Sequence, residues 1–174
     1  MAASTVWYIP LGKITVREMT LFAVLGALTF AAKYVMAVLP NIEPVSLMVM
    51  LFGATFGRKA LYPIYLYVVM ELLFYGLGTW NIMYLYIWPL LGLMAWLLRD
   101  MEHPLGWAIL SGAFGLLFGA LCMPVDVVIG GFEYAAAKWI SGIPFDITHC
   151  IGNFVIAWIL FSPMRKLLEK LYRQ

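Results

Sequence analysis

Six long apolar stretches, separated by short segments that hold most of the charged residues, constrain this chain more than any single motif. A bilayer-spanning helix needs about 20 apolar residues, so 174 residues have room for five to seven of them. Charged residues make up 11% of the chain, against about 25% in soluble domains, and the mean hydropathy is +0.93. We therefore expect an all-α integral membrane protein, one compact bundle over residues 1–174 with no soluble catalytic domain.

Turn and cap residues place the expected helices. Thr15 and Glu18 form a Thr-x-x-Glu capping box that begins the first helix, and Pro40 ends it. The sequence predicts helices over 16–39, 45–56, 60–75, 82–98, 105–129 and 144–163. Residues 130–143 are expected to form a longer loop, residues 1–15 a short interfacial segment, and residues 164–174 a basic amphipathic tail.

The distribution of basic residues predicts a topology with both termini in the cytoplasm. With six spans, only Lys33 and Lys138 of the eleven basic residues fall toward the outer side. The other nine fall on the side of the termini: Lys13, Arg17, Arg58, Lys59, Arg99, Arg165, Lys166, Lys170 and Arg173. Basic residues are retained in the cytoplasm, which fixes the orientation. Net charge is only +2 and no basic block is present, so nucleic acid is not an expected partner.

Polar and aromatic residues gather on the predicted outer side. A Gly-, Trp- and Asn-rich loop at 76–81 leads into an aromatic helix start, and five carboxylates accompany it in the outer half. Ionisable groups within spans are costly and face cavities or one another, so the set predicts one outward-facing binding site closed by loops. The candidate binding residues are Asn41, Glu43, Glu71, Trp80, Asn81, Tyr84, Asp126, Trp139, Asp146, His149 and Asn153.

Simpler interpretations of the same residues stay open. Glu71 could only pair with Lys33 across the bundle. Asp146 and His149 are one helical turn apart and could only satisfy each other. The tryptophans and tyrosines could form an interfacial belt.

No catalytic motif is found in the sequence. It contains no H-E-x-x-H, G-x-S-x-G or Walker pattern, and Cys122 and Cys150 lack metal-ligand spacing. We expect no enzyme activity, no cofactor and no metal.

A small-residue stripe runs along the first expected helix. Ala23, Ala27 and Ala31 recur every four residues, which allows another helix backbone to approach closely. The stripe could pack inside the bundle or dock a partner protein.

Three segments together give the chain a family resemblance. They are the alanine stripe, the stretch 40–59 (PNIEPVSLMVMLFGATFGRK) and the stretch 142–153 (GIPFDITHCIGN). The chain resembles the substrate-binding S components of energy-coupling factor (ECF) transporters, a form of ABC importer, over nearly its whole length.

The resemblance implies a mechanism and partners. An S component captures a vitamin or related micronutrient from outside a bacterial plasma membrane, which it crosses several times. It docks through its first helix, here Ala23, Ala27 and Ala31, on a membrane coupling subunit bound to two ATPase subunits. ATP hydrolysis then belongs to those partners.

The substrate and the functional class leave alternatives. An aromatic site with five outer acids against two bases favours a flat, cationic or amide-rich ligand. Thiamine-like, pyridine- or pyrimidine-like, queuosine-precursor and cobalamin substrates all remain open, and folate is disfavoured. The alternative function is a self-sufficient facilitator or channel, or a structural membrane subunit.

Overall fold

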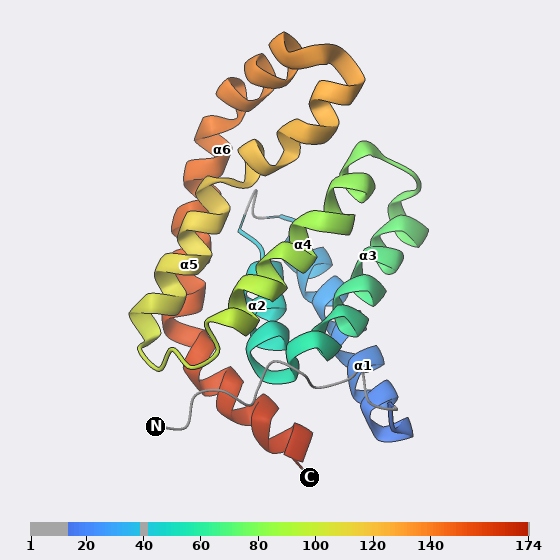
Figure 1. Cartoon of the computed structure of the whole chain (residues 1–174), viewed down its shortest axis with the longest axis vertical. Helices are drawn as coiled ribbons and strands as arrows, with labels where there is room; N and C mark the ends of the chain where they lie inside the picture. The colour runs from blue at the N-terminus through green and yellow to red at the C-terminus, as the bar shows by residue number, and fades with distance from the viewer. Residues whose placement is uncertain (1–13, 39–41, 174) are drawn as a thin grey trace.

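The chain folds into a bundle of helices, seen in a computed structural model that describes residues 14–38 and 42–173 (Figure 1). Within those ranges every regular element is helical. The elements are α1 (Val16–Met36), α2 (Val45–Phe56), the 3₁₀ turn η1 (Gly57–Ala60), α3 (Leu61–Tyr75), α4 (Thr79–Leu97), α5 (Pro104–Leu116) and α6 (Phe118–Arg173). The all-α fold class predicted from hydropathy is confirmed for the described residues.

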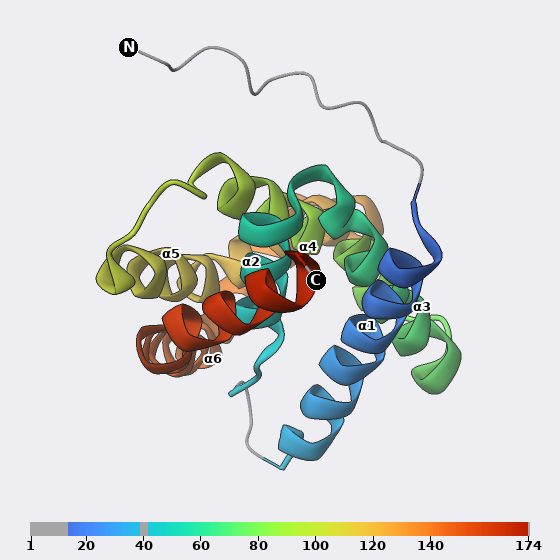
Figure 2. The same ribbon diagram turned by 90° about the horizontal axis from the view of Figure 1, so that it is seen from below.

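The bundle has two outer helix pairs and a central one. Viewed along the bundle, α1 lies beside α3 on one side, α5 beside α6 on the other, and α2 and α4 between them (Figure 2). The central helix α2 is buried on all its faces, from Val45 through Ala54 and again at Phe56. It supplies much of the hydrophobic core, which explains why nearly every residue of this short helix is apolar.

The signals at helix ends act as the sequence predicts. The Thr15 hydroxyl accepts from the Glu18 N–H at 3.2 Å, and the Glu18 carboxylate accepts from the Thr15 N–H at 3.0 Å, completing the capping box. Gly57 (φ 59°) ends α2 and Gly76 (φ 78°) ends α3, both in a backbone region that glycine adopts at little cost. The predicted bounds of α2 match the structure. By contrast, α1 ends at Met36 rather than at residue 39, and α4 begins at Thr79 rather than at residue 82, so the last three residues of the expected loop at 76–81 are helical.

The second half of the chain corrects three boundaries. The expected helix over 105–129 is interrupted at Leu117, where α5 ends and α6 begins. The expected loop over 130–143 is helical except at Gly131 (φ 82°), where α6 kinks and turns back beside itself (Figure 1). The helix also continues through Pro144 and Pro163 to Arg173, so the tail at 164–173 is part of α6. Neighbouring helices allow proline inside membrane helices, and here the proline positions did not end them.

Three stretches are long and apolar enough to cross a membrane: Val16–Met36, Thr79–Leu97 and Pro104–Arg173. The last stretch holds both α5 and α6. With 12 and 15 residues, α2 and α3 are shorter than a span of about 20 residues requires. The described fold is thus a bundle with several apolar helices compatible with a membrane.

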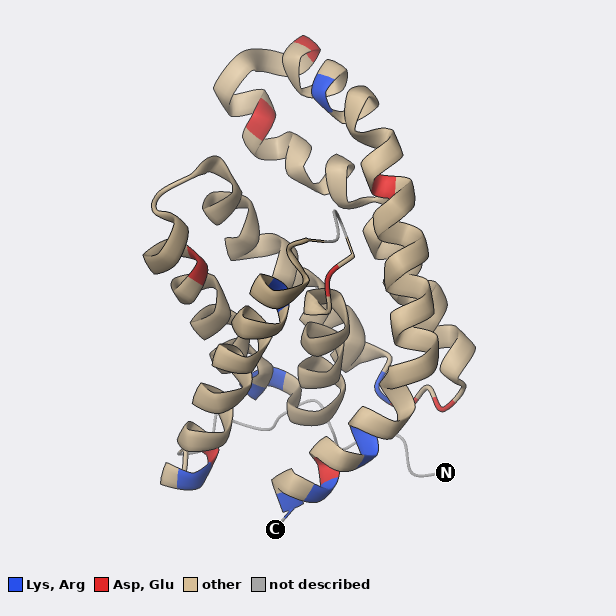
Figure 3. Ribbon diagram, turned by 180° about the vertical axis from the view of Figure 1, so that it is seen from behind, with Lys and Arg blue, Asp and Glu red and all other residues tan. Residues whose placement is uncertain are grey.

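Lysine and arginine concentrate at the end of the bundle where α1 begins and α6 ends (Figure 3). The two elements meet there, because the Tyr172 hydroxyl donates to Glu18 at 2.8 Å and Arg17 donates to the Leu171 carbonyl. We call this the basic end; its members are Arg17, Arg58, Lys59, Arg99, Arg165, Lys166, Lys170 and Arg173. The opposite end carries the kink of α6 and several carboxylates (Figure 3).

Candidate functional site

A buried ion pair joins α1 to α3. Lys33 donates to the Glu71 carboxylate at 2.8 Å, with the two side chains only 15% and 2% exposed. Lys33 also donates to the Tyr84 hydroxyl at 3.4 Å, which brings α4 into the contact. The pairing considered as the simpler interpretation of Glu71 is therefore present, and it is part of a larger polar group.

Aromatic rings surround this ion pair. The Lys33 ammonium lies 5.2 Å from the ring centre of Tyr84 and 6.0 Å from that of Tyr67. The Tyr84 and Trp88 rings are 5.4 Å apart, edge to face. Cations are attracted to such ring faces, so the rings stabilise a positive charge here. We call Lys33, Tyr67, Glu71, Tyr84 and Trp88 the Lys33 cluster.

Glu43 lies in the connection between α1 and α2, and its electrostatic environment includes this cluster. Burial raises the pKa of the Glu43 carboxyl, the positive charge of Lys33 opposes that effect, and the negative charge of Glu71 adds to it. The nearest cation, Lys33, is already paired with Glu71. Glu43 is thus a half-buried carboxylate without an ion-pair partner among the described residues.

A second polar group runs along α6. Asp146, His149 and Asn153 follow at i, i+3 and i+7, which places them on one helix face, and all three are buried. Asp146 accepts from the Gly119 N–H at 3.1 Å, and Asn153 donates to the Ser46 hydroxyl at 2.9 Å and the Ser111 carbonyl at 3.3 Å. We call Ser46, Ser111, Asp146, His149 and Asn153 the Asp146 ladder. No hydrogen bond joins Asp146 to His149 in the described part of the chain.

The glycines of α5 and early α6 let this ladder approach closely. A Cβ atom on Gly115 would lie 2.9 Å from the His149 carbonyl group, and one on Gly119 would lie 2.9 Å from the Trp139 ring. The small-residue positions Ser111, Gly115 and Gly119 thus pack against α6. Trp139 lies beside Asp146 and is half-buried.

One aromatic residue links the Lys33 cluster to the Asp146 ladder. The Phe118 ring lies 5.6 Å from that of Trp88 and 5.2 Å from that of His149. The two groups therefore adjoin at Trp88, Phe118 and His149.

Buried polar atoms without a hydrogen-bond partner are concentrated in these two groups. Of nine such atoms in the described residues, seven belong to the cluster or the ladder: Tyr67 OH, Glu71 Oε1, Trp88 Nε1, Ser111 Oγ, Asp146 Oδ2, His149 Nε2 and Asn153 Oδ1. Leaving a buried polar group unpaired costs about 1–3 kcal/mol. A bound molecule with matching donors and acceptors would recover that energy.

The remaining candidate residues have different environments. Asp126 pairs with Lys138 at 2.6 Å, which connects the two arms of α6 on either side of Gly131. Asn81 is buried, and its side chain accepts from the Gly78 N–H at 2.8 Å at the start of α4. Trp80 is 44% exposed, and Asn41 lies outside the described residues.

Five members of the two groups were not among the candidates: Lys33, which was considered only as a partner of Glu71, and Tyr67, Trp88, Ser46 and Ser111. A spacing of four residues, from Tyr67 to Glu71 and from Tyr84 to Trp88, places each pair on one helix face and could have found the two aromatic residues. The serines had no such signal.

The alanine stripe of α1 faces away from the core. Ala23 and Ala31 are exposed and Ala27 is half-buried, whereas Phe22, Leu25, Gly26 and Thr29 face inward. The stripe is therefore open to lipid or to a partner.

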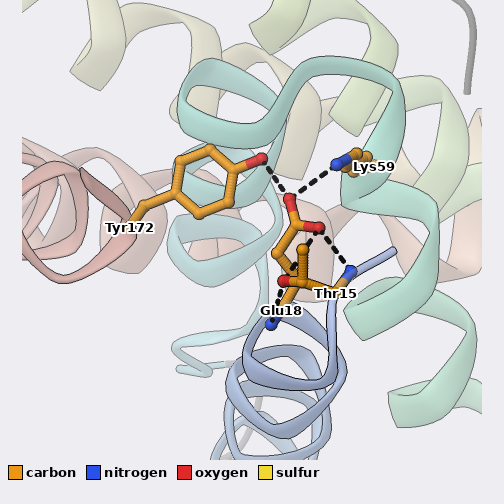
Figure 4. Close-up of polar contacts among 4 residues, drawn as sticks. All are labelled: Thr15, Glu18, Lys59 and Tyr172. Atoms are coloured by element: carbon orange, nitrogen blue, oxygen red, sulfur yellow. Dashed lines mark hydrogen bonds and ion pairs between the residues drawn. The ribbon is translucent and has the colours of Figure 1, made fainter. Parts of the chain in front are cut away.

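A separate polar network joins three elements at the basic end (Figure 4). Glu18 accepts from Lys59 at 2.6 Å and from the Tyr172 hydroxyl at 2.8 Å, in addition to its capping bonds with Thr15. These contacts attach the start of α1 to η1 and to the end of α6.

Within residues 14–38 and 42–173, no three His, Cys, Asp or Glu side chains are grouped so as to hold a metal ion. No family model, curated protein or solved structure matches the chain.

Proposed function

We propose that the chain is the substrate-binding membrane subunit of an ECF-type importer for a vitamin or a related micronutrient. The observation that carries the proposal is the set of seven unpartnered buried polar atoms in two groups that adjoin at Phe118. A bundle that needed only to be stable would have apolar side chains at these positions, because unpaired polar groups cost energy.

The composition of the two groups favours a flat ligand. Tyr67, Tyr84, Trp88 and Phe118 supply ring faces, and polar atoms lie beside them. Small-molecule sites combine apolar and aromatic walls with a few polar groups in this way.

The charge balance favours a ligand that is cationic or rich in N–H donors. Lys33 and Lys138 are each paired with a carboxylate, to Glu71 and Asp126. Asp146 and Glu43 have no cation within ion-pair distance in the described part of the chain. A polyanion would meet uncompensated carboxylates there.

The remaining features of the proposal concern topology and docking. The basic end would face the cytoplasm and the kinked end of α6 the outside, as the positive-inside rule predicts. The exposed stripe of Ala23, Ala27 and Ala31 would contact the coupling subunit, where small side chains let helices approach. Six membrane segments and cytoplasmic termini are part of this proposal.

The test is mass spectrometry of small molecules released by denaturing the detergent-purified protein. We expect one stoichiometric, flat, vitamin-like compound from the native chain and at least a tenfold loss from Asp146→Asn. Glu133→Gln is the matched control, because Glu133 is an exposed carboxylate beside the kink, and it should leave the yield unchanged.

The alternative of a self-sufficient facilitator or structural subunit predicts a different result. An empty native protein that also fails to bind candidate vitamins in calorimetry would overturn the binding role. Replacing Ala27 with Leu separates coupling from binding: it should abolish uptake with the ATPase partners while leaving ligand binding intact.

A further inference from the structure

A hollow of about 450 Å³ opens between α3 and α4, two helices that lie side by side (Figure 1). Its floor is formed by Ala60, Ile64 and Gly92, all of which are buried. Leu61 and Leu93 line its rim and are 41% and 45% exposed. No residue of the Lys33 cluster or the Asp146 ladder lines it. The hollow is therefore a separate, largely apolar site, which we call the α3–α4 groove.

The groove begins at the basic end and follows α4. A Cβ atom on Gly57 would lie 3.1 Å from the Trp96 indole nitrogen, so η1 closely approaches the last turn of α4. Farther along, a Cβ atom on Gly92 would lie 2.8 Å from the Ile64 side chain. Pro89 also lines the groove and precedes Trp96 by seven residues, about 10 Å along the helix. The groove thus extends from the basic end toward the middle of an apolar helix long enough to cross a membrane.

A hydrogen bond between the two helices fixes their spacing beyond the groove. Pro89 has no backbone N–H, so the Leu85 carbonyl lacks its usual partner within α4. The Tyr65 hydroxyl of α3 donates to this carbonyl at 3.2 Å. The groove is therefore built into the fold and needs no ligand to form.

Arg58 supplies the charge of the groove. It is the one charged side chain among the described residues that line it, and no carboxylate joins it there. Its guanidinium lies 5.9 Å from the Trp96 ring centre, which places it at the basic end of the groove. Within residues 14–38 and 42–173 Arg58 forms no ion pair, and Glu18 pairs instead with the neighbouring Lys59. An exposed positive charge is therefore available to a ligand.

We propose that the α3–α4 groove binds an anionic membrane phospholipid, with its phosphate on Arg58 and one acyl chain along Leu61, Ile64 and Leu93. The groove and a lipid have the same order of chemistry, a charge at the end of the bundle followed by apolar surface toward its middle. Tryptophan and arginine suit the membrane interface, where their apolar parts face the chains and their polar tips the headgroups.

Basic pockets between membrane helices on the cytoplasmic side bind lipid headgroups, which fits the place of Arg58 at the basic end. A zwitterionic headgroup would bring its own ammonium group close to Arg58, so a headgroup with net negative charge is favoured. The inference requires a membrane-embedded chain and does not depend on vitamin binding.

The experiment is native mass spectrometry of the detergent-purified chain titrated with phosphatidylglycerol or with phosphatidylcholine of the same acyl chains. We expect phosphatidylglycerol to bind about fivefold more tightly, the gain that one basic residue contributes. Arg58→Gln should weaken phosphatidylglycerol binding by about fivefold and remove the preference. The matched control Arg173→Gln removes an exposed arginine from the same end outside the groove and should change binding by less than about twofold.

A second pair of variants tests the apolar part of the groove. Leu93→Trp narrows the groove without changing any charge and should weaken the binding of both lipids, with unchanged helix content by circular dichroism. Its matched control is Leu90→Trp, at a position of α4 that is 37% exposed and does not line the groove, and it should bind both lipids as the native chain does. Arg58→Lys keeps the charge and should retain the preference for phosphatidylglycerol.

Several results would overturn the proposal. Equal affinity of the native chain for the two lipids would remove the role of Arg58, and equal weakening by Arg173→Gln would show only a general attraction to the basic end. Full lipid binding in Leu93→Trp would place the acyl chain elsewhere. If neither Arg58→Gln nor Leu93→Trp weakened lipid binding, the groove would be left for a partner protein.

Discussion

Breaking the ion pair between Lys33 and Glu71 tests the central packing of the bundle. In Glu71→Gln the Lys33 ammonium keeps the Tyr84 hydroxyl at 3.4 Å but loses the carboxylate at 2.8 Å. Both side chains are mostly removed from solvent, at 15% and 2% exposure, so water cannot replace the lost partner easily. The cost arises chiefly from an uncompensated charge in a poorly polarisable environment.

The magnitude follows from the burial. Removing one partner of a buried pair costs roughly 3–5 kcal/mol, whereas replacing both with apolar residues is often near neutral. For a chain of this size, 1 kcal/mol corresponds to about 2–4 °C in Tm, so Glu71→Gln should lower Tm by roughly 6–20 °C. The double variant Lys33→Met/Glu71→Met should recover most of that loss.

The assay is thermal unfolding in one detergent, followed by helix content. The variants are Glu71→Gln, Lys33→Met and Glu71→Met singly and together, and exposed Glu133→Gln as control. A double-variant loss equal to the sum of the two single losses would refute the reasoning, because the residues would then act independently. So would a Glu71→Gln loss no larger than that of the control.

Three other perturbations test close packing and charge. Gly53→Ala should cost about 1–3 kcal/mol in thermal unfolding because a Cβ there would overlap the backbone of α4, whereas Gly142→Ala, with open space around it, should be neutral or stabilising. Burial raises the pKa of the Glu43 carboxyl, so the native state holds this proton more tightly than the unfolded state does, and the free energy of unfolding should fall as the pH rises from about 4.5 through that raised pKa. Glu43→Gln should flatten this part of a curve of unfolding free energy against pH. An unchanged slope would contradict the assignment. In Gly119→Ala the added Cβ would overlap the Asp146 carboxylate. The yield of co-purified small molecule should therefore fall while the circular dichroism spectrum stays unchanged. An unaltered yield would argue against a ligand at the Asp146 ladder.

The sequence predicted the first four helices with every end within three residues of the structure, and most closely where strong end signals flank them. The bounds of α2 were predicted correctly, since Pro44 and Gly57 flank an apolar run. The Thr15–Glu18 box fixed the start of α1 in the same way.

In α6 the same residue types gave wrong boundaries. The pair Gly130-Gly131 and Pro144 predicted a loop, yet only Gly131 leaves the helical region. In the structure, packing against α5 and the pairing of Asp126 with Lys138 hold together the two arms of α6 before and after Gly131. Local sequence does not show these contacts. Pro163 failed as a helix end for a related reason, because Arg165 attaches the following turn to the α4–α5 connection.

For the candidate site, the gathering of polar residues on the predicted outer side carried the useful information. It included Asp146, His149 and Asn153, and the structure finds all three buried. It could not predict which distant side chain would meet each of them, as when Asn153 bonds Ser46, 107 residues away in the chain. Trp80 shows the limit of composition, since its 44% exposure fits an interfacial belt as well as a binding role.

The burial of α2 has a consequence for how the protein is made. A 12-residue helix is about 18 Å long, too short to hold itself across a hydrocarbon core of about 30 Å. Its packing partners α4 and α6 lie later in the chain, so a ribosome has nearly finished synthesis before α2 can be enclosed. A chain truncated before α6 would therefore lose part of the cover of α2 and expose apolar side chains that the complete bundle encloses.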